Sequence, residues 1–147
     1  MQEKIRVKGH IIAKLFDKAG NLKDIRDIDN LVVTVGKNYL ATWLAAASQA
    51  GEFMSYIGVG TGTNSPTAGD TDLQTPLSTR VQGTLSSSSN VWQNVASFGA
   101  GVDTGAITEA GLFSVSSSGT LFARQTFSVI NKGANDTLQI TWQVTFS

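Results

Sequence analysis

Within the last thirteen residues of the chain, residues 137–146 alternate polar and hydrophobic side chains without a break. A period of two places alternate side chains on opposite faces of a strand, so residues 135–147 predict a strand with one buried face. Residues 119–130 predict a second strand, and the turn-forming residues 131–136 predict that the two pair as an antiparallel hairpin. The hydrophobic row of the last strand is Leu138, Ile140, Trp142, Val144 and Phe146.

The beginning of the chain shows the same alternation with more charge. Residues 4–16 have a hydrophobic face and a basic face, residues 17–21 have turn composition, and residues 22–33 predict a returning strand with interspersed aspartates. We therefore expect a charged β-hairpin over residues 1–33, in which lysines on one strand face aspartates on the other. It is either a solvated sheet edge or an arm that projects from the body and adds a strand to a neighbouring sheet.

The period then changes to that of an amphipathic helix. Hydrophobic residues recur at spacings of three and four, which predicts one short α-helix around residues 35–48, ending near residues 48–51. We expect this helix to cover one end or one face of a sheet. The residues that carry the pattern are Tyr39, Leu40, Trp43, Leu44 and Ala47.

Short strands separated by turns of small residues fill the rest of the chain. The patterns predict strands over residues 53–62, 79–87, 90–98 and 107–115. The predicted fold class is therefore all-β, a mainly antiparallel β-sandwich or barrel-like structure with one short helix. A length of 147 residues suits a single domain, with residues 34–147 as its body.

Composition removes several classes of function. Charged residues are 15% of the chain and the formal net charge is zero, so no electrostatic field favours nucleic acid or an anionic membrane as partner. The chain has no cysteine, which excludes disulfides and thiolate chemistry. No segment has the pattern of a signal peptide or a membrane span, so we expect a soluble protein.

The glycine-rich segment of residues 60–72 superficially resembles a phosphate-binding loop. A nucleotide loop delivers its backbone N–H groups into a helix N-terminus and often carries a Lys-Ser/Thr pair, neither of which follows here. The spacing of Asp70 and Asp72 occurs in calcium loops, but the other oxygen ligands are missing. We therefore predict no cofactor and no metal, and expect Asp70 or Thr71 to cap a helical turn over residues 73–77.

The same residues give no support for catalysis. His10 is the only histidine and sits on the basic face of a strand, so the serine runs lack a base, and Glu109 lacks a second carboxylate. We predict no catalytic residues and no enzyme activity. Glu109 and Arg124 are also explained as a bonded pair across neighbouring strands. A carbohydrate-binding β-sandwich remains an alternative, with Trp92 as sugar platform and Trp142 assigned to the core.

Three segments together resemble small structural proteins of tailed bacteriophages. They are residues 30–41, residues 56–77 with Arg80, and residues 109–113 followed by residues 121–127 and the strand over residues 136–146. The resemblance covers roughly residues 30–147, and the middle segment is the most specific. It implies a β-rich virion component of the capsid exterior or of the tail, and it brings no catalytic residues.

The resemblance leads to a functional hypothesis. We expect a capsid decoration, or cement, protein, made in the host cytoplasm, that binds the major capsid protein on the outside of the head and forms a homo-oligomer, a trimer by analogy with other decoration proteins. The alternative is a tail fibre, collar or baseplate module. The first hairpin and the glycine-rich loop are the expected contact regions, through Arg6, Lys8, Lys14, Lys23, Arg26, Thr61, Asn64 and Asp70.

Overall fold

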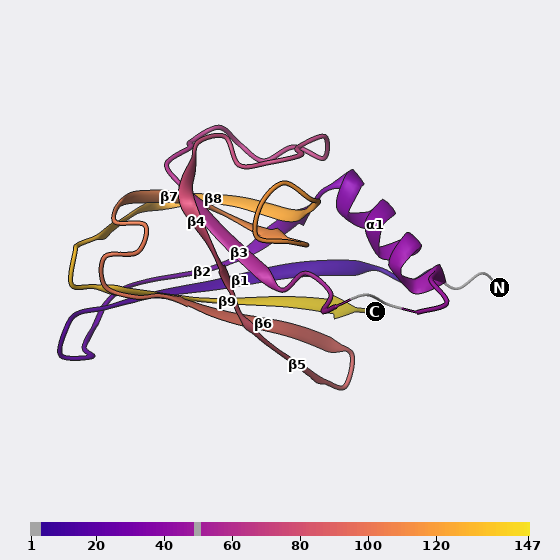
Figure 1. Ribbon diagram of the computed structural model, residues 1–147, viewed down its shortest axis with the longest axis horizontal. Coiled ribbons are helices and arrows are strands. Elements are labelled where there is room, and N and C mark those ends of the chain that lie inside the picture. The colour runs from indigo at the N-terminus through magenta and orange to yellow at the C-terminus, as the bar shows by residue number, and fades with distance from the viewer. Residues whose placement is uncertain (1–3, 49–50) are drawn as a thin grey trace.

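The computed structural model describes residues 4–48 and 51–147, and within them nine strands form one antiparallel sheet that curls into a nearly closed barrel with two layers (Figure 1). The order across the sheet is β4-β3-β7-β8-β2-β1-β9-β6-β5. The predicted fold class, all-β with one short helix, is confirmed. The elements are β1 Val7–Phe16, β2 Leu22–Val32, α1 Thr34–Ala45, β3 Tyr56–Gly60, β4 Pro76–Gln82, β5 Thr84–Ser88, β6 Val91–Phe98, β7 Gly105–Phe113, β8 Leu121–Lys132 and β9 Thr137–Phe146.

The two layers join at opposite sides of the barrel. On one side β2 pairs with β8 through only Leu31–Arg124 and Val32–Ala123, and farther along β2 the Arg26 side chain bonds the carbonyl oxygens of Ser128 and Val129 on β8. On the other side β4 runs directly into β5 through Gly83. A Cβ at Gly83 would lie 1.7 Å from the side-chain oxygen of Asn94, so only glycine fits at this corner.

The hydrophobic row of β9 lies at the centre of the core, as its alternation predicts. Trp142 is fully buried, and its cross-strand neighbours are Ile11 on β1 and Asn94 on β6. The prediction that Trp142 belongs to the core is confirmed. The polar residues of β9 face outward, where Gln143 donates a hydrogen bond to Gln93 over 3.0 Å.

The predicted hairpin between the last two strands is wrong. β8 pairs with β7 and β2, whereas β9 pairs with β1 and β6. The β1–β2 hairpin lies between β8 and β9 in the sheet, so the turn of residues 133–136 carries the chain from one layer to the other (Figure 1). A period of two reports which face of a strand is buried, but it does not report which strands are neighbours.

The proposal of a projecting arm over residues 1–33 is also wrong for the described part of the hairpin. β1 is paired on both sides, with β2 and with β9, over nearly its whole length. Ile11, Ala13 and Leu15 are buried in the main core. The hairpin is therefore part of the barrel wall, and residues 1–3 lie outside the described residues.

The single helix of the described chain, α1, covers one open end of the barrel, as expected (Figure 1). Its buried Gly36 contacts β8 so closely that a Cβ would lie 2.5 Å from the carbonyl oxygen of Phe122. Tyr39 and Trp43 pack around Phe53, with ring centroids 6.1 and 5.2 Å away. The helix ends at Ala45, earlier than predicted, because Ala46 already has extended backbone angles; residues 49–50 of the expected stop are outside the described residues.

Candidate interaction surface

A fully buried ion pair connects two neighbouring strands of one layer. Arg124 on β8 donates from Nε and Nη2 to Oε2 of Glu109 on β7, over 3.0 and 2.9 Å. Glu109 is 0% exposed and Arg124 is 1% exposed. The prediction of a bonded pair across neighbouring strands is confirmed.

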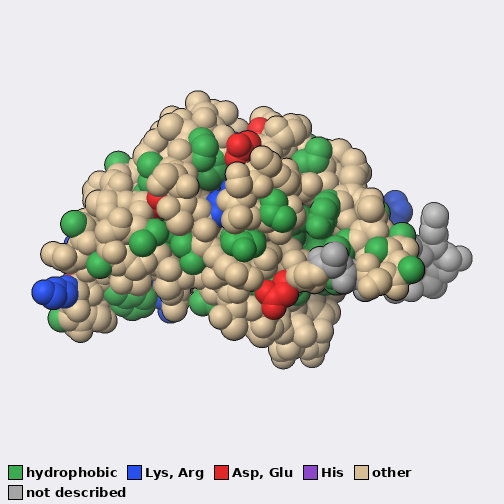
Figure 2. Space-filling view, in the orientation of Figure 1, with side chains coloured by type: hydrophobic (Ala, Val, Ile, Leu, Met, Phe, Trp, Pro, Cys, Tyr) green, Lys and Arg blue, Asp and Glu red, His purple; other side chains and the backbone are tan. Residues whose placement is uncertain are grey.

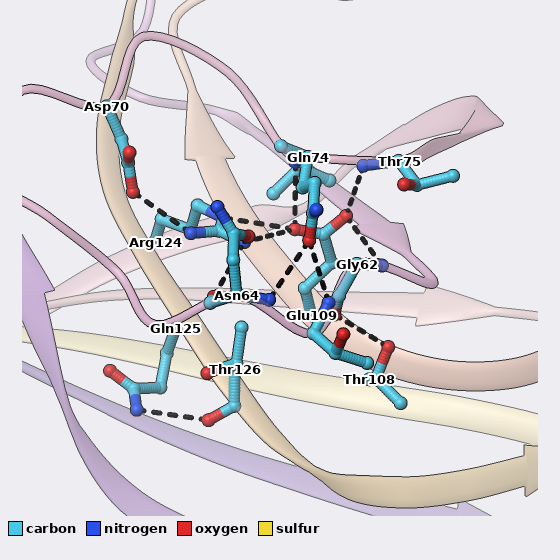
Figure 3. Close-up of polar contacts among 12 residues, drawn as sticks. Gly62, Asn64, Asp70, Gln74, Thr75, Thr108, Glu109, Arg124, Gln125 and Thr126 are labelled. Carbon is cyan, nitrogen blue, oxygen red and sulfur yellow. Dashed lines mark hydrogen bonds and ion pairs between the residues drawn. The ribbon is translucent and has the colours of Figure 1, made fainter.

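The same pair fixes the glycine-rich loop, which lies directly over it (Figure 3). The Glu109 carboxylate accepts hydrogen bonds from the backbone N–H groups of Gly62, Gln74 and Thr75, over 2.8–3.1 Å. On its other side, Arg124 donates to the side chains of Asn64 and Asp70, over 2.6 and 3.0 Å. The loop between β3 and β4 therefore has one defined conformation and is anchored by buried charge.

Asp70 has a structural role in this loop. It accepts hydrogen bonds from the backbone N–H and hydroxyl of Thr67 and from Arg124. Burial acts to raise the pKa of the Asp70 carboxyl, but these bonds outweigh it and hold the pKa below its usual range. The predicted helical turn over residues 73–77 is wrong, because the segment after Asp70 is irregular and β4 begins at Pro76.

The predicted contact residues of the loop are thus only partly available to a partner. Asn64 is exposed at the residue level, but its side-chain oxygen is bonded to Arg124. Asp70 is mostly covered, whereas Thr61 is exposed and pairs through its backbone N–H with Thr75. The structure brings Asn64 and Asp70 together on the guanidinium of Arg124. Their side-chain oxygens accept its hydrogen bonds, which explains why an amide and a carboxylate stand at these positions.

The five predicted contact residues of the hairpin do not form one cluster. Arg6 continues the β1–β9 ladder by exchanging backbone hydrogen bonds with Ser147. Lys23 donates to Asp136 over 2.9 Å, and Arg26 donates to the carbonyl oxygens of Ser128 and Val129 on β8. Two further lysines lie on the outer face of β1, the exposed Lys8 and the half-buried Lys14.

The expectation that hairpin lysines face aspartates is wrong for Lys14, which lies opposite Ile25. The histidine of the same face holds the aspartates instead. His10 Nδ1 bonds Asp29 over 2.7 Å, and His10 Nε2 bonds Asp27. A carboxylate only accepts hydrogen bonds, so both contacts exist together only when both ring nitrogens carry a proton. The hydrogen bond to Asp29 is the largest cause that raises the pKa of His10 above 6.5, against the opposing effect of burial.

We expect this contact to make the stability of the protein depend on pH. Because the folded-state pKa of His10 is raised, its contribution is fully present below pH 6.5 and is lost as the pH rises through the folded pKa. Unfolding by urea at pH 6 and pH 8.5 measures the difference, and H10Q is the control. A pH dependence in H10Q equal to that of the natural chain would contradict the assignment.

A hydrophobic surface surrounds the exposed side of α1. Two cavities of about 350 and 380 Å³ lie beside the helix, and both are lined by Leu40, Leu44 and Phe146. Leu44 is 66% exposed and Ile5 is 77% exposed. We call these residues together the α1 apolar surface: the exposed Ile5 and Leu44, the partly exposed Val7, Leu40, Trp43, Leu85, Trp92 and Phe146, and the buried Phe53 and Val144 beneath them.

Charge is scarce around this surface. Lys37 and Glu52 are the charged residues that line the two cavities within the described chain. Figure 2 likewise shows few charged side chains on its face of the molecule, with exposed hydrophobic side chains at the end that carries α1. Contiguous exposed hydrophobic groups with aromatic side chains are typical of protein–protein contacts.

The sequence did not reveal the α1 apolar surface, because a hydrophobic stripe on a helix is normally buried. Here the stripe is wide, and its two halves have different environments. Tyr39 and Trp43 pack against the core cluster, whereas Leu44 remains exposed. Ile5 and Phe146, from the two ends of the chain, extend the surface in a way that only the folded structure shows.

Neither of the two tryptophans considered as sugar platforms presents a fully exposed ring. Trp142 is buried, and Trp92 packs edge-on against Phe53 with ring centroids 5.9 Å apart. Within residues 4–48 and 51–147, no group of three or more histidine, aspartate or glutamate side chains could hold a metal ion. No helix of the described chain is long and apolar enough to cross a membrane.

Comparison with known proteins gave no match to a family model, to a curated protein or to a solved structure.

Proposed function

We propose that this protein is a structural component of a tailed-bacteriophage particle, and specifically a decoration protein that binds the outside of the head and stabilises the lattice of the major capsid protein. The α1 apolar surface is the observation that carries the proposal. An exposed hydrophobic surface of this kind on a sparsely charged chain is suited to lasting contact with another protein. The resemblance of residues 30–147 to virion proteins supplies the identity of that partner.

The mechanism follows from binding to the assembled state. A protein that binds the assembled lattice but not the free subunits stabilises assembly by RT ln(1 + [L]/Kd). At a concentration of about one hundred times Kd this amounts to about 2.7 kcal/mol per site. Many sites on one head multiply this effect, so a modest contact at each α1 apolar surface is sufficient.

The barrel suits this role because it holds its exposed parts rigidly. β1 and β9 pair along their whole length, and the loop of residues 60–75 is fixed by Glu109 and Arg124. Preformed surfaces lose little conformational entropy on binding. Oligomerisation as a trimer is part of the same hypothesis, with the virion as the location and neither nucleic acid nor membrane as partner.

The resemblance also includes tail proteins. In a collar or baseplate, the α1 apolar surface would pack against a neighbouring ring subunit instead of the capsid lattice. The number of copies per particle separates the two locations.

Leu44→Asp tests the proposed contact. The substitution places a charge at the centre of the α1 apolar surface, and Leu44 is 66% exposed, so the fold itself should tolerate it. We expect binding to purified heads that lack the protein to weaken by more than about tenfold. Val115→Asp, at an exposed residue away from this surface, is the matched control. Equal head binding by both variants in a co-sedimentation assay would remove the α1 apolar surface from the account.

A further inference from the structure

β2 presents an open strand edge. One edge of β2 pairs with β1 over Leu22–Asn30, but the other pairs with β8 only at Leu31 and Val32. No strand of the described chain pairs with the rest of that edge, although at Ile25 the backbone N–H donates to Asp24 Oδ1 over 2.9 Å and the carbonyl oxygen accepts from Arg26 over 2.8 Å. Hydrophobic side chains are also exposed here, because Leu22 is 53% exposed and Ile25 is 44% exposed. An open edge of this length is a template for pairing with another strand.

The sequence of this edge is complementary to itself. The residues from Lys23 to Asp27 read Lys-Asp-Ile-Arg-Asp. In an antiparallel pair of two copies centred on Ile25, the two isoleucines lie opposite each other. Asp24 then faces Arg26 of the other copy, and Lys23 faces Asp27, each twice because of the two-fold axis. Opposite charges and paired hydrophobic side chains directly across a sheet are favourable.

The neighbouring registers are unfavourable. When a two-fold axis relates two copies in one continuous sheet, the strand pair is symmetric about a single residue. That residue lies directly opposite its own copy. Centring the pair on Lys23, Asp24, Arg26 or Asp27 places that charge directly against its own copy. Centring it on Ile28 places Asp27 against Asp29 twice. Like charges directly opposite each other destabilise a strand pair, so only the register centred on Ile25 is free of them.

Charged residues on an edge strand often prevent pairing. On β2 the charged residues disfavour the registers centred on the neighbouring residues and favour the register centred on Ile25. In the single chain Arg26 donates to Asp24 and to the carbonyl oxygens of Ile25, Ser128 and Val129. Pairing with a second copy would replace its bond to the Ile25 carbonyl oxygen by a backbone bond from the other strand. A guanidinium has five N–H donors, so it can bond a second carboxylate without losing the first.

We propose that two copies of this protein associate through their β2 edges, antiparallel and centred on Ile25, to form a continuous sheet across a two-fold axis. This contact uses a different part of the surface from the α1 apolar surface, and it does not rest on the proposed function. It also differs from the trimer implied by the resemblance.

The mass of the purified protein in sedimentation equilibrium tests the contact. The chain has a mass of 15.5 kDa, and we expect a concentration-dependent species of twice that mass. Ile25→Lys places two positive charges face to face on the axis and should leave a monomer, whereas Val115→Lys, at an equally exposed residue elsewhere, should leave the dimer unchanged. A monomer throughout, a trimer, or a dimer that Ile25→Lys does not weaken would overturn the proposal.

Cross-linking tests the register independently. The natural chain has no cysteine, so a single introduced thiol reacts only with its copy. On the axis, two Ile25→Cys side chains would have Cβ atoms about 4.5–5.5 Å apart and should form a covalent dimer on oxidation or with a short bismaleimide. Asp29→Cys lies on the same strand and face, but its copies would be roughly 27 Å apart and should not react. Equal cross-linking of the two variants would overturn the register.

Discussion

Replacing Glu109 by alanine is expected to destabilise the protein by about 3–5 kcal/mol. The substitution leaves the Arg124 guanidinium buried without its counter-charge, in a position that is 1% exposed. It also removes the acceptor for the backbone N–H groups of Gly62, Gln74 and Thr75. We expect a lower urea midpoint and rapid proteolysis between residues 61 and 75.

The double variant Glu109→Leu with Arg124→Met separates these two effects. Replacing both charges with hydrophobic side chains removes the unpaired cation, so much of the global stability should return. The loop should remain sensitive to protease, because its three N–H groups still lack an acceptor. An E109A variant whose free energy of unfolding falls by less than about 1 kcal/mol, or whose loop of residues 61–75 stays resistant to protease, would show that the buried pair does not organise this loop.

The second large effect is expected at Trp142. Replacing this residue by alanine should lower the free energy of unfolding by about 3–5 kcal/mol. Trp142 is fully buried, so its removal leaves a cavity that the strands on both sides cannot fill. Its neighbours β1 and β6 are held in register along most of β9, which limits their movement. Chemical denaturation monitored by circular dichroism measures the loss.

Trp142→Phe is the informative comparison. The indole N–H of Trp142 is buried without a hydrogen-bond partner in the described structure. Phenylalanine fills part of the same volume and removes that unbonded donor, so we expect less than half of the loss caused by alanine. Equal losses for the two variants would mean that packing around this residue does not control stability as described.

Much of the fold was predictable because alternation reports burial. The pattern of residues 135–147 predicted both a strand and the buried position of Trp142, and the change of period after residue 33 predicted the helix. Glu109 and Arg124 were predictable as a pair because other charges are scarce in that part of the chain. Each of these inferences uses only local pattern or a small choice of partners.

The order of the strands was not predictable in the same way. The turn of residues 131–136 has hairpin composition, yet it connects strands that are separated by β1 and β2 in the sheet. The charged hairpin was expected as a solvated edge or as an arm; β2 does have an open edge, but Ile11, Ala13 and Leu15 place β1 in the core. Neighbour relations depend on the packing of the whole chain, which alternation does not encode.

The candidate surfaces show the same division. The positions of Asn64 and Asp70 in the exposed loop were predicted, but their bonds to Arg124 were not, because Arg124 lies on a strand distant from the loop in sequence. The α1 apolar surface was missed because Leu44 belongs to a stripe that normally faces inward. The five-residue charge pattern around Ile25 was visible in the sequence, but its meaning depends on β2 having an open edge.

The central claim is tested most directly by the number of copies of this protein in purified virions, measured by quantitative mass spectrometry against the major capsid protein. A decoration protein that covers the head predicts a number comparable with that of the capsid subunits. A small symmetric number would place the protein in the tail or at a single vertex, and its absence from the particle would contradict the proposed function.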